Sequence, residues 1–392
     1  MLKILTIIGA RPQIIKAAAI SRAIRTHYAD RVREVIVHTG QHYDERMSAI
    51  FFEELQIPQP DYNLQVGSGK HGAQSARMII GVEEILEKEV PDFLVIYGDT
   101  NSTLAAAVAA AKIHVPIVHI EAGLRSFNKK MPEEINRILS DHVSTYLFPP
   151  TETGYANLLR EGFVADRLPP YTIDRPGIFN VGDVMYDNTL YFSKVAEEKS
   201  PVLAEYALTK NEFVLATLHR NANTDDATRL NAIFRAFEAI TEKYEITLVL
   251  PLHPRTVKQM DLLLDSELLK RIKHNSFIKL IEPVSFLDMI QLEKYAKLIL
   301  TDSGGVQKEA YFLNCPCIIL REETEWVEIV ENGAAILCDA DGQRILDACQ
   351  YFENNPNITF KNSYGNGDAA ERILQVMVEM AGLAARTVPV RP

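Results

Sequence analysis

The sequence predicts an α/β protein of two doubly wound domains, each a parallel sheet with helices on both faces. Three observations support this prediction. The chain has 392 residues, 47% of them hydrophobic, which exceeds what a single core usually serves. Short apolar runs alternate with segments of helical periodicity, as in parallel α/β sheets. Polar side chains directly follow many of the apolar runs, where open parallel sheets bind their ligands.

Four strand-like runs predict the sheet of the first domain. They cover residues 2–8, 34–39, 93–97 and 117–120. Helical spacing follows at residues 12–25, between His42 and residue 55, and at 104–112. The connecting loops are short, so we expect the strands to lie parallel with the helices packed across them.

A second series of runs predicts the second domain. A polar, proline-rich interval at 167–176 precedes a run at 178–182 and a helix from about residue 185. Further runs, each followed by a helical segment, are at 213–218, 247–250, 277–281, 297–301 and 316–320. We expect domains at residues 1–182 and 183–368, with a last helix from residue 369 that crosses back onto the first domain.

Composition limits the classes of binding partner and the cellular compartment that we expect for this protein. The formal net charge of −11 argues against nucleic acid or an anionic membrane surface as the main partner. The apolar stretch at the N-terminus is too short to span a membrane and lacks a small-residue cleavage site, so we interpret it as the first strand. Four cysteines without paired CxxC spacing indicate reduced core residues of a cytoplasmic protein.

The stretch KLILTDSGGVQKEAYFL predicts an anion-binding turn. It resembles a buried strand, a turn at Gly304 and Gly305, and a helix. Asp302 and Ser303 are N-cap types. Glycines let an anion approach the backbone, where the unpaired N–H groups and positive dipole end of the helix face it. An ordinary strand-to-helix turn explains the same residues, because no lysine follows the glycines as in a P-loop.

Seven polar residues each follow a predicted strand. They are Arg11, His42, Asp99, Glu121, His219, His253 and Ser303. The carboxyl ends of parallel strands share one edge of a sheet, and these residues come from both halves of the chain. They therefore predict a cleft between two facing domains, with acid and base chemistry on one side and phosphate binding on the other.

The carboxylates of the first half suit proton transfer, and each also has a structural explanation. Asp99 in YGDTNST could cap the following helix. Glu121 ends the apolar run IVHI, so we expect it to be partly buried with a raised pKa, as suits a general acid or base. Glu133 and Glu134 stand in the first turn of a helix that begins at Pro132, where the helix dipole alone explains them.

Two further residues have open roles. His219 could steady a pyrophosphate or move a proton, although a lone histidine at a strand end is more often structural. We expect His253, between two prolines, to be structural. Trp326, the only tryptophan, is either a core anchor or a stacking platform, and we favour the platform.

Basic residues supply the charge that an anionic ligand needs in an acidic protein. Arg11, Lys16 and Arg321 are the candidates, although Lys16 alone would be a solvated helix residue by default. Arg125 and Arg137 are either partners that keep the carboxylates charged or surface residues.

Motifs spread in order over essentially the whole chain resemble one family, the non-hydrolysing UDP-N-acetylglucosamine 2-epimerases. The motifs are GARPQ, HTGQH, YGDTNST, EAGLRS, MPEEINR, HR and TDSGGVQKE. The resemblance implies a fold similar to the two-domain GT-B type glycosyltransferases, a homodimer, and a UDP-sugar held without a metal or dissociable redox cofactor. It also implies that UDP is eliminated to give a 2-acetamidoglucal and adds back after C2 is reprotonated from the other face.

The resemblance assigns roles to matching positions. The acid and base carboxylates fall on Asp99, Glu121 and Glu133, without a decision as to which is acid and which is base, and the family's histidine falls on His219. The expected UDP and phosphate contacts are Arg11, Lys16, His219, Ser303, Gly304, Gly305, Glu309 and Arg321. The expected substrate or activator contacts are Gln41, His42, Arg125, Arg137 and Trp326.

Departures from the usual family motifs narrow the choice of substrate. The first loop is GARPQ where GTRPE is usual, Ala222 stands where a Glu is usual, and Trp326 stands in TEWVE where TERPE brings an Arg to the nucleotide. The motifs GARPQIIKA, HTGQHYD, SFNKKMPEEINR, GDVMYD and TEWVE are more similar to the branch acting on UDP-2,3-diacetamido-2,3-dideoxyglucuronate. That branch makes the manno epimer for surface polysaccharide, and we predict this substrate.

Four other interpretations stay open at this point. The first is the same reaction on plain UDP-N-acetylglucosamine, and the second is a hydrolysing epimerase that releases free sugar and UDP. The third is a glycosyltransferase of the same fold, which would need fewer carboxylates than Asp99, Glu121 and Glu133. The fourth is a catalytically silent nucleotide-sugar sensor.

Overall fold

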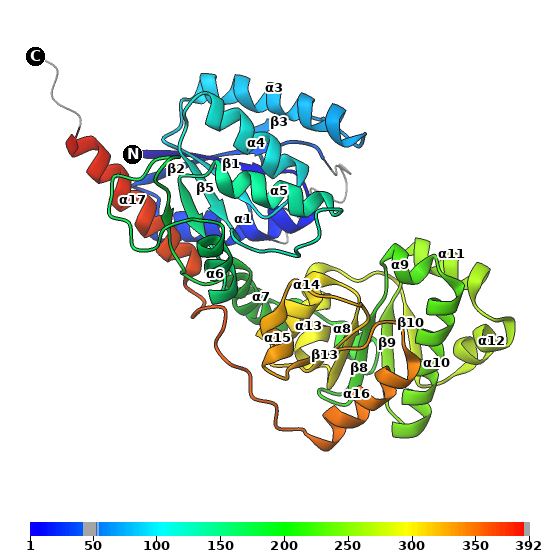
Figure 1. Ribbon diagram of the computed structural model, residues 1–392. Coiled ribbons are helices and arrows are strands. Elements are labelled where there is room, and N and C mark those ends of the chain that lie inside the picture. The colour runs from blue at the N-terminus through cyan, green and yellow to red at the C-terminus, as the bar shows by residue number, and fades with distance from the viewer. Residues whose placement is uncertain (42–51, 53–54, 388–392) are drawn as a thin grey trace, which may run out of the picture. The chain divides into compact units, whose positions relative to one another are not determined.

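The computed structural model describes residues 1–41, 52 and 55–387 of the chain (Figure 1). The helix expected between His42 and residue 55 lies almost wholly outside these residues. The chain forms two compact units, of which unit 1 combines Met1–Asn188 with Asn362–Pro392 and unit 2 is Thr189–Lys361. The first crossing between the units is at Asn188, where the sequence indicated Gly182.

Unit 1 contains a parallel sheet. Its strands are β1 (Leu2–Ile8), β2 (Val32–His38), β3 (Tyr62–Asn63), β4 (Phe93–Tyr97), β5 (Ile117–Ile120), β6 (Tyr146–Phe148) and β7 (Gly177–Ile178). They pair in parallel in the order β3-β2-β1-β4-β5-β6-β7. The order reverses between β1 and β4, and open parallel sheets bind ligands outside the carboxyl ends at such a reversal.

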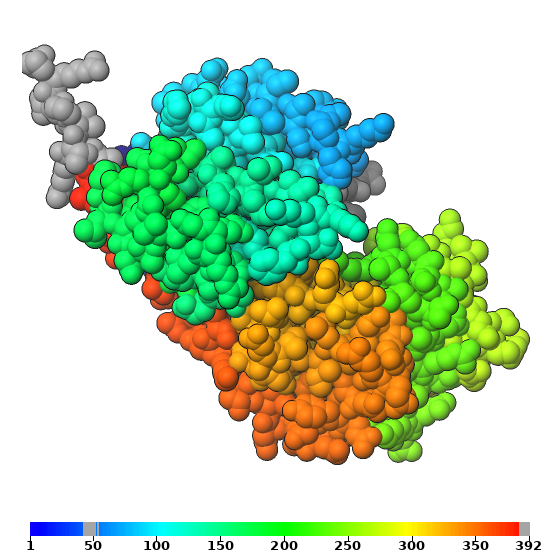
Figure 2. All heavy atoms as spheres, in the orientation of Figure 1, coloured from blue at the N-terminus to red at the C-terminus, as the bar shows by residue number. Residues whose placement is uncertain are grey.

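Helices cover this sheet. They are α1 (Arg11–Ala23), which continues as a π-helical turn (Ile24–Tyr28), α3 (His71–Glu89), α4 (Asn101–Lys112), α5 (Pro132–His142), α6 (Glu152–Arg160) and α17 (Ala369–Thr387). Leu5 and Ile7 of β1 pack with Ala106 and Ala110 of α4, as expected for alternate strand residues on one face. α4 packs against α3, whose side chains form part of the outer surface of unit 1 (Figure 2), and α17 packs against α1.

Unit 2 contains a second parallel sheet. Its strands are β8 (Phe213–Thr217), β9 (Thr247–Pro251), β10 (Ile278–Ile281), β11 (Leu298–Thr301), β12 (Cys317–Ile319) and β13 (Ala335–Leu337). Their order, β10-β9-β8-β11-β12-β13, repeats the order in unit 1, with the reversal between β8 and β11. The fold class is thus confirmed as two Rossmann-like parallel sheets.

The helices of unit 2 begin with α7 (Val184–Lys199), which carries the chain from unit 1. The others are α8 (Val202–Glu205), α9 (Asn221–Thr224), α10 (Ala227–Tyr244), α11 (Pro254–Leu263), α12 (Ser266–His274), α13 (Phe286–Tyr295), α14 (Gly304–Phe312), α15 (Val327–Glu331) and α16 (Gly342–Asn354). Phe234 and Phe237 of α10 pack on Val214 and Ala216 of β8 in the core. All four cysteines are buried with free thiols. In the part of the chain that the structure describes, no helix combines the length and apolarity that crossing a bilayer requires.

Candidate active site

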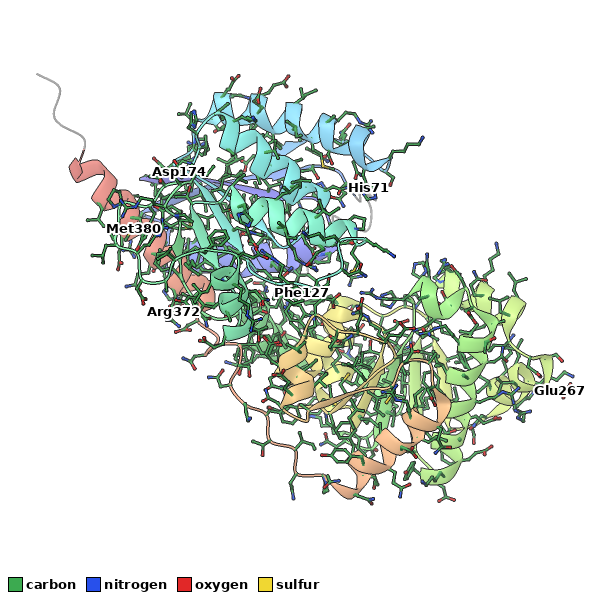
Figure 3. The ribbon with its side chains drawn as sticks, in the orientation of Figure 1. His71, Phe127, Asp174, Glu267, Arg372 and Met380 are labelled. Carbon is green, nitrogen blue, oxygen red and sulfur yellow. The ribbon has the colours of Figure 1, made fainter. Side chains whose placement is uncertain are left out.

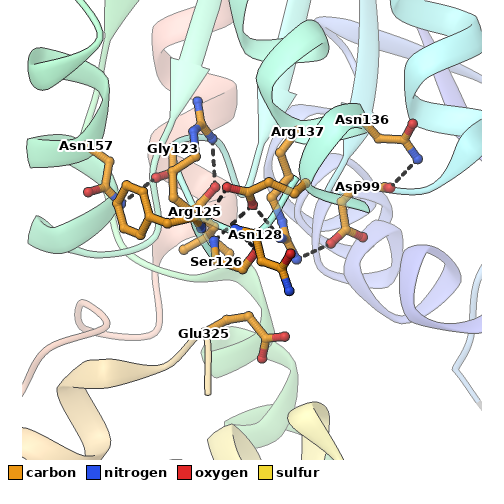
Figure 4. Close-up of polar contacts among 12 residues, drawn as sticks. Asp99, Gly123, Arg125, Ser126, Asn128, Asn136, Arg137, Asn157 and Glu325 are labelled. Carbon is orange, nitrogen blue, oxygen red and sulfur yellow. Dashed lines mark hydrogen bonds and ion pairs between the residues drawn. The ribbon is translucent and has the colours of Figure 1, made fainter. Parts of the chain in front are cut away.

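Asp99 and Arg137 meet at the carboxyl edge of the first sheet (Figure 4). Asp99 lies two residues beyond β4, and Nη2 of Arg137 on α5 lies 2.5 Å from its Oδ2. Burial raises the pKa of Asp99, and the charges of Arg137 and Lys16 partly offset that rise. The carboxylates of Glu121 and Glu133 raise it further. Asp99 therefore holds a proton more tightly than a solvated aspartate does.

Asp99 does not cap the helix that follows it. The N-cap of α4 is Thr100, whose hydroxyl accepts a hydrogen bond from the N–H of Thr103 at 3.2 Å. The main-chain oxygen of Asp99 instead accepts a hydrogen bond from Nδ2 of Asn136 at 2.8 Å. The structural explanation that the sequence offered for the Asp99 carboxylate thus belongs to its neighbour.

Glu121 and Lys16 form a buried ion pair on the adjacent strand end. Nζ of Lys16, on α1, lies 2.5 Å from Oε1 of Glu121. Glu121 is 7% exposed and Lys16 8%, so Glu121 is buried as expected and Lys16 is not the solvated residue that its position suggested. Gly98 lies against the pair, because a Cβ built there would stand 3.0 Å from both charged atoms. Glu121 has a φ of +70°, an uncommon conformation for a residue with a Cβ.

Glu134, rather than Glu133, is the carboxylate that organises the loop before α5. Glu134 accepts hydrogen bonds from the N–H groups of Ser126 and Phe127, both at 2.9 Å, and lies 3.1 Å from Nη1 of Arg137. Burial opposes its ionisation, but these donors lower its pKa overall. Glu133 is exposed in the first turn. The spacing of Glu134 and Arg137, three residues apart, was the sequence signal for this pair.

Arg125 does not join the Asp99 cluster. Its Nη1 lies 2.8 Å from Oδ2 of Asp141, and its Nε lies 2.7 Å from Oε1 of Glu161. The Arg125 side chain is 1% exposed, so the alternative of a surface residue is wrong. Sequence reasoning missed Asp141, which lies ten residues into a segment that reads as an ordinary amphipathic helix.

Three further residues that the sequence placed in the site follow β1 or β2 along the chain, namely Arg11, Gln41 and His42. Arg11 is exposed at the first position of α1. Oε1 of Gln41 accepts hydrogen bonds from the N–H and the hydroxyl of Ser102, at 3.1 and 2.7 Å, which fixes the end of β2 to the start of α4. His42 lies outside the described residues.

His219 and Asp302 meet at the reversal of the second sheet. Nδ1 of His219 lies 3.2 Å from Oδ1 of the buried Asp302, and 53% of the His219 side chain is exposed. Asp302 also accepts hydrogen bonds from the N–H groups of His219 and Arg220. Burial opposes the ionisation of Asp302, but His219 and these donors lower its pKa overall. Asp302 therefore orients His219 and is not an N-cap.

The glycines after β11 belong to the helix rather than to a turn before it. α14 begins at Gly304, and Ser303 is its N-cap, accepting from the N–H of Val306 at 3.5 Å. The turn expected at Gly304 and Gly305 is therefore the first turn of the helix, which the sequence did not indicate because glycine is a poor helix former by propensity. Built Cβ atoms would meet nothing nearer than 3.7 Å at Gly304 and 3.9 Å at Gly305. The first turn of α14 thus presents backbone N–H groups with no side chain of their own in front of them.

Arg321 and Trp326 lie near this turn in unit 2. Nη1 and Nη2 of Arg321 each lie 3.1 Å from a carboxylate oxygen of Glu325. Trp326 is 7% exposed, and Nζ of Lys308 lies 3.9 Å from the centre of its ring. His253 caps α11 by accepting from the N–H of Arg255 at 3.3 Å, the structural role expected of it.

Comparison with known proteins identifies the family. The profile of the UDP-N-acetylglucosamine 2-epimerase family matches residues 24–378. The chain belongs to this family. It is 49% identical to a UDP-N-acetylglucosamine 2-epimerase homolog of Methanococcus maripaludis, over 96% of this chain and 99% of the relative. It is 46% identical to the UDP-2,3-diacetamido-2,3-dideoxy-D-glucuronate 2-epimerase of Pseudomonas aeruginosa, over 97% of this chain and all of the relative.

A solved structure supports the same assignment. The Methanocaldococcus jannaschii UDP-GlcNAc 2-epimerase, in complex with UDP-GlcNAc and UDP, matches with a TM-score of 0.82 and 44% identity. The match covers 96% of this chain and 100% of that one. The architecture is therefore of GT-B type, and the chain is an epimerase, an isomerase acting on carbohydrates.

Proposed function

We propose that this epimerase inverts C2 of a UDP-linked 2-acetamido sugar by eliminating UDP and adding it back. One observation carries the proposal. Asp99 and Glu121 stand at the carboxyl ends of the adjacent strands β4 and β5, and each contacts a cation, Arg137 or Lys16. Removing a proton from one face of C2 and returning one to the other face requires two such groups.

The reaction balances without an oxidant or reductant. A carboxylate removes the C2 proton as the C1–O bond to UDP breaks, which leaves a 2-acetamidoglucal with a double bond between C1 and C2. A second group then protonates the opposite face of C2 while the UDP oxygen adds back at C1. Asp99, Glu121 and Glu133 are the proposed acid and base groups, with His219 as a further proton carrier.

We propose that the nucleotide binds at the first turn of α14. The leaving UDP is an anion, and helix-end N–H groups stabilise such a charge as it forms. Gly304 and Gly305 have no side chain of their own in front of these N–H groups, and the Arg321 guanidinium lies 3.7 Å from a Cβ built at Gly304, which supports the approach of a phosphate. Glu309 lies one turn further along the same helix, as a proposed nucleotide contact.

The finer proposal is that the substrate is UDP-2,3-diacetamido-2,3-dideoxyglucuronate, converted to the mannuronate epimer for surface polysaccharide synthesis. The relative of that name supports it. So does the loop between β5 and α5, which carries the exposed Phe127, labelled in Figure 3, and the exposed Lys129 and Lys130 that follow it in the sequence. Glu134 holds this loop and also contacts Arg137, the partner of Asp99. A lysine here would meet the carboxylate that distinguishes this sugar.

Plain UDP-N-acetylglucosamine is the second candidate. A relative from Methanocaldococcus jannaschii named UDP-N-acetylglucosamine 2-epimerase is 45% identical over 96% of the chain, so overall similarity does not separate the two sugars. Turnover of both sugars decides between them. We expect a preference for the diacetamido uronate, and that Lys129→Ala with Lys130→Ala raises its KM without raising that of the neutral sugar.

We also propose that the enzyme acts as a cytoplasmic homodimer without a metal or dissociable cofactor. The family resemblance supports this assembly, and the buried free thiols suit a reducing compartment. Light scattering during size-exclusion chromatography tests the assembly. A mass of 44.1 kDa would indicate the monomer and twice that mass the dimer.

Glu121→Gln tests the chemistry. We expect the variant to lose nearly all exchange of the C2 hydrogen with solvent while it binds UDP within a few-fold of the wild type. Glu84→Gln, an exposed residue on α3, is the matched control and should behave as the wild type. Retained exchange in Glu121→Gln would remove that residue from the acid and base set.

A further inference from the structure

His119 is a buried polar residue inside an otherwise apolar strand. It is the third residue of β5, in the sequence IVHI, and it is 0% exposed. A valine or isoleucine would suit this position better, because burying an imidazole costs free energy unless both of its nitrogens find partners. Both nitrogens of His119 do have partners, and neither partner lies in the same strand.

The two partners of His119 are both hydrogen-bond acceptors. Nδ1 lies 2.7 Å from Oδ1 of Asp141 on α5, and Nε2 lies 2.8 Å from the main-chain oxygen of Gly98. A carbonyl oxygen can only accept, so Nε2 must carry a proton. Burial opposes the ionisation of Asp141, but the charges of His119 and Arg125 lower its pKa overall, so Asp141 is an acceptor as well. Both ring nitrogens of His119 therefore face hydrogen-bond acceptors.

Asp141 is itself held on its other oxygen. Its Oδ2 lies 2.8 Å from Nη1 of Arg125 and accepts a hydrogen bond from the N–H of Gly123 at 3.1 Å. Two groups of the loop between β5 and α5 thus converge on this carboxylate. His119 is consequently fixed in orientation, since its partner cannot rotate without losing these contacts.

The residue that accepts the hydrogen bond from His119, Gly98, is connected through the main chain to both carboxylates proposed as acid and base. Gly98 immediately precedes Asp99, and its N–H donates to the main-chain oxygen of Ile120, which immediately precedes Glu121. Gly98 has a φ of +60° and lies against the ion pair of Glu121. A movement of the Gly98 peptide would therefore change the positions of both the Asp99 and the Glu121 carboxyl groups.

We propose that His119 is a positioning residue, which holds the Gly98 carbonyl so that Asp99 and Glu121 keep the separation that proton transfer at C2 requires. This rests on the acid and base roles proposed for Asp99 and Glu121. His119 does not touch substrate in this proposal. It acts through the hydrogen bond from Nε2 to Gly98, and Asp141 acts by holding the ring.

Two variants of His119 separate this role from a purely structural one. The amide nitrogen of asparagine stands near the place of Nδ1, and that of glutamine stands near the place of Nε2. His119→Asn therefore keeps a donor for Asp141 and loses Gly98, whereas His119→Gln keeps a donor for Gly98 and loses Asp141. A structural role would make both variants lose activity in proportion to their loss of melting temperature.

The proposal predicts an asymmetry between the variants. We expect His119→Asn to lower kcat about 100-fold, the scale of a displaced catalytic group, with KM and UDP affinity within about 3-fold of the wild type. His119→Gln should retain at least tenfold more kcat than His119→Asn, whatever their melting temperatures. Equal kcat in the two variants, or the reverse order, would overturn the proposal.

A measurement on the wild type keeps the proposal testable if the variants do not fold. In the ¹⁵N spectrum of imidazole-labelled enzyme at neutral pH, the His119 Nε2 should carry a proton, because it faces the Gly98 carbonyl. A ring whose Nε2 carries no proton at neutral pH would overturn the proposal. Failure of the proposed function would be distinct, since Glu121→Gln would then retain C2 exchange. If Glu121→Gln loses C2 exchange but His119→Asn and His119→Gln have equal kcat, only the positioning role of His119 would be overturned.

Discussion

Replacement of Arg137 by methionine tests the electrostatic control of Asp99. Arg137 lies 2.5 Å from Asp99 and 3.1 Å from Glu134, and methionine keeps much of its length without its charge. Loss of the cation disfavours the ionised form of Asp99, so its pKa rises further above its usual value. A higher pH is then needed to reach the same ionised fraction, and the limb of the rate profile that Asp99 sets moves to higher pH.

The size of this movement follows from the geometry. Unit charges about 4 Å apart interact by about 4 kcal/mol at an effective dielectric constant of about 20, which corresponds to about three pK units. The Asp99 side chain is 26% exposed, so water screens part of its interaction with Arg137. We therefore expect the limb to move by about one to two pH units.

The assay is the pH dependence of kcat for exchange of the C2 hydrogen in D₂O. Arg137→Lys should show a smaller movement than Arg137→Met, because the charge stays while the second contact is lost. Arg235→Met is the surface control, since Arg235 is 56% exposed and lies 3.6 Å from Asp265. A uniform fall in kcat with both limbs in their original places would refute the reasoning.

Three other predictions address binding and stability. Gly305→Ala should weaken UDP binding about tenfold without lowering the melting temperature, because its Cβ has room in the protein but fills the space before the α14 amides; unchanged binding by calorimetry would place the phosphates elsewhere. Burial raises the pKa of Asp187 to about 6 from its ordinary 3.8, although it accepts hydrogen bonds from Ala369 and Ala370. The folded state binds this proton more tightly, so wild-type stability should fall by about 2–3 kcal/mol relative to Asp187→Asn as pH rises from about 4 to about 6, and parallel urea-derived curves would contradict this. Both carboxyl oxygens of Glu293 are buried without a hydrogen-bond partner among the described residues, and burial raises its pKa well above the usual range. Glu293→Met should therefore raise the free energy of unfolding by about 1–4 kcal/mol at pH 8 and by less at pH 4, whereas an equal gain at both pH values would show that the buried carboxyl carries no such cost.

The strands were predictable because parallel strands buried on both faces leave continuous apolar runs. The runs at 2–8, 93–97 and 117–120 coincide with β1, β4 and β5. No predicted run corresponds to β3, β6 or β13. These elements have two or three residues each, too few for periodicity to be visible.

The positions of Asp99 and Glu121 could be predicted, because the end of a strand is a local property of the sequence. Arg137 was one of two arginines proposed as partners of the carboxylates, whereas the partner of Glu121 could not be predicted. Lys16 is 105 residues from Glu121, and its place on α1 suggested solvent. His119 stood as the one polar interruption of an apolar run, and nothing nearby in the sequence showed that Asp141 would meet it. Such contacts depend on which helix covers which strand, and that is decided by the whole sheet.

The central claim is that the C2 hydrogen leaves the sugar and returns from solvent while UDP stays available for re-addition. The most direct measurement is turnover of the UDP-sugar in D₂O, followed by mass spectrometry and proton NMR of the product and by assay of free UDP. The account predicts one deuterium at C2 of the epimerised product, with free UDP remaining a small fraction of it. A product that keeps its original C2 hydrogen, or UDP and free sugar released one for each turnover, would contradict the account.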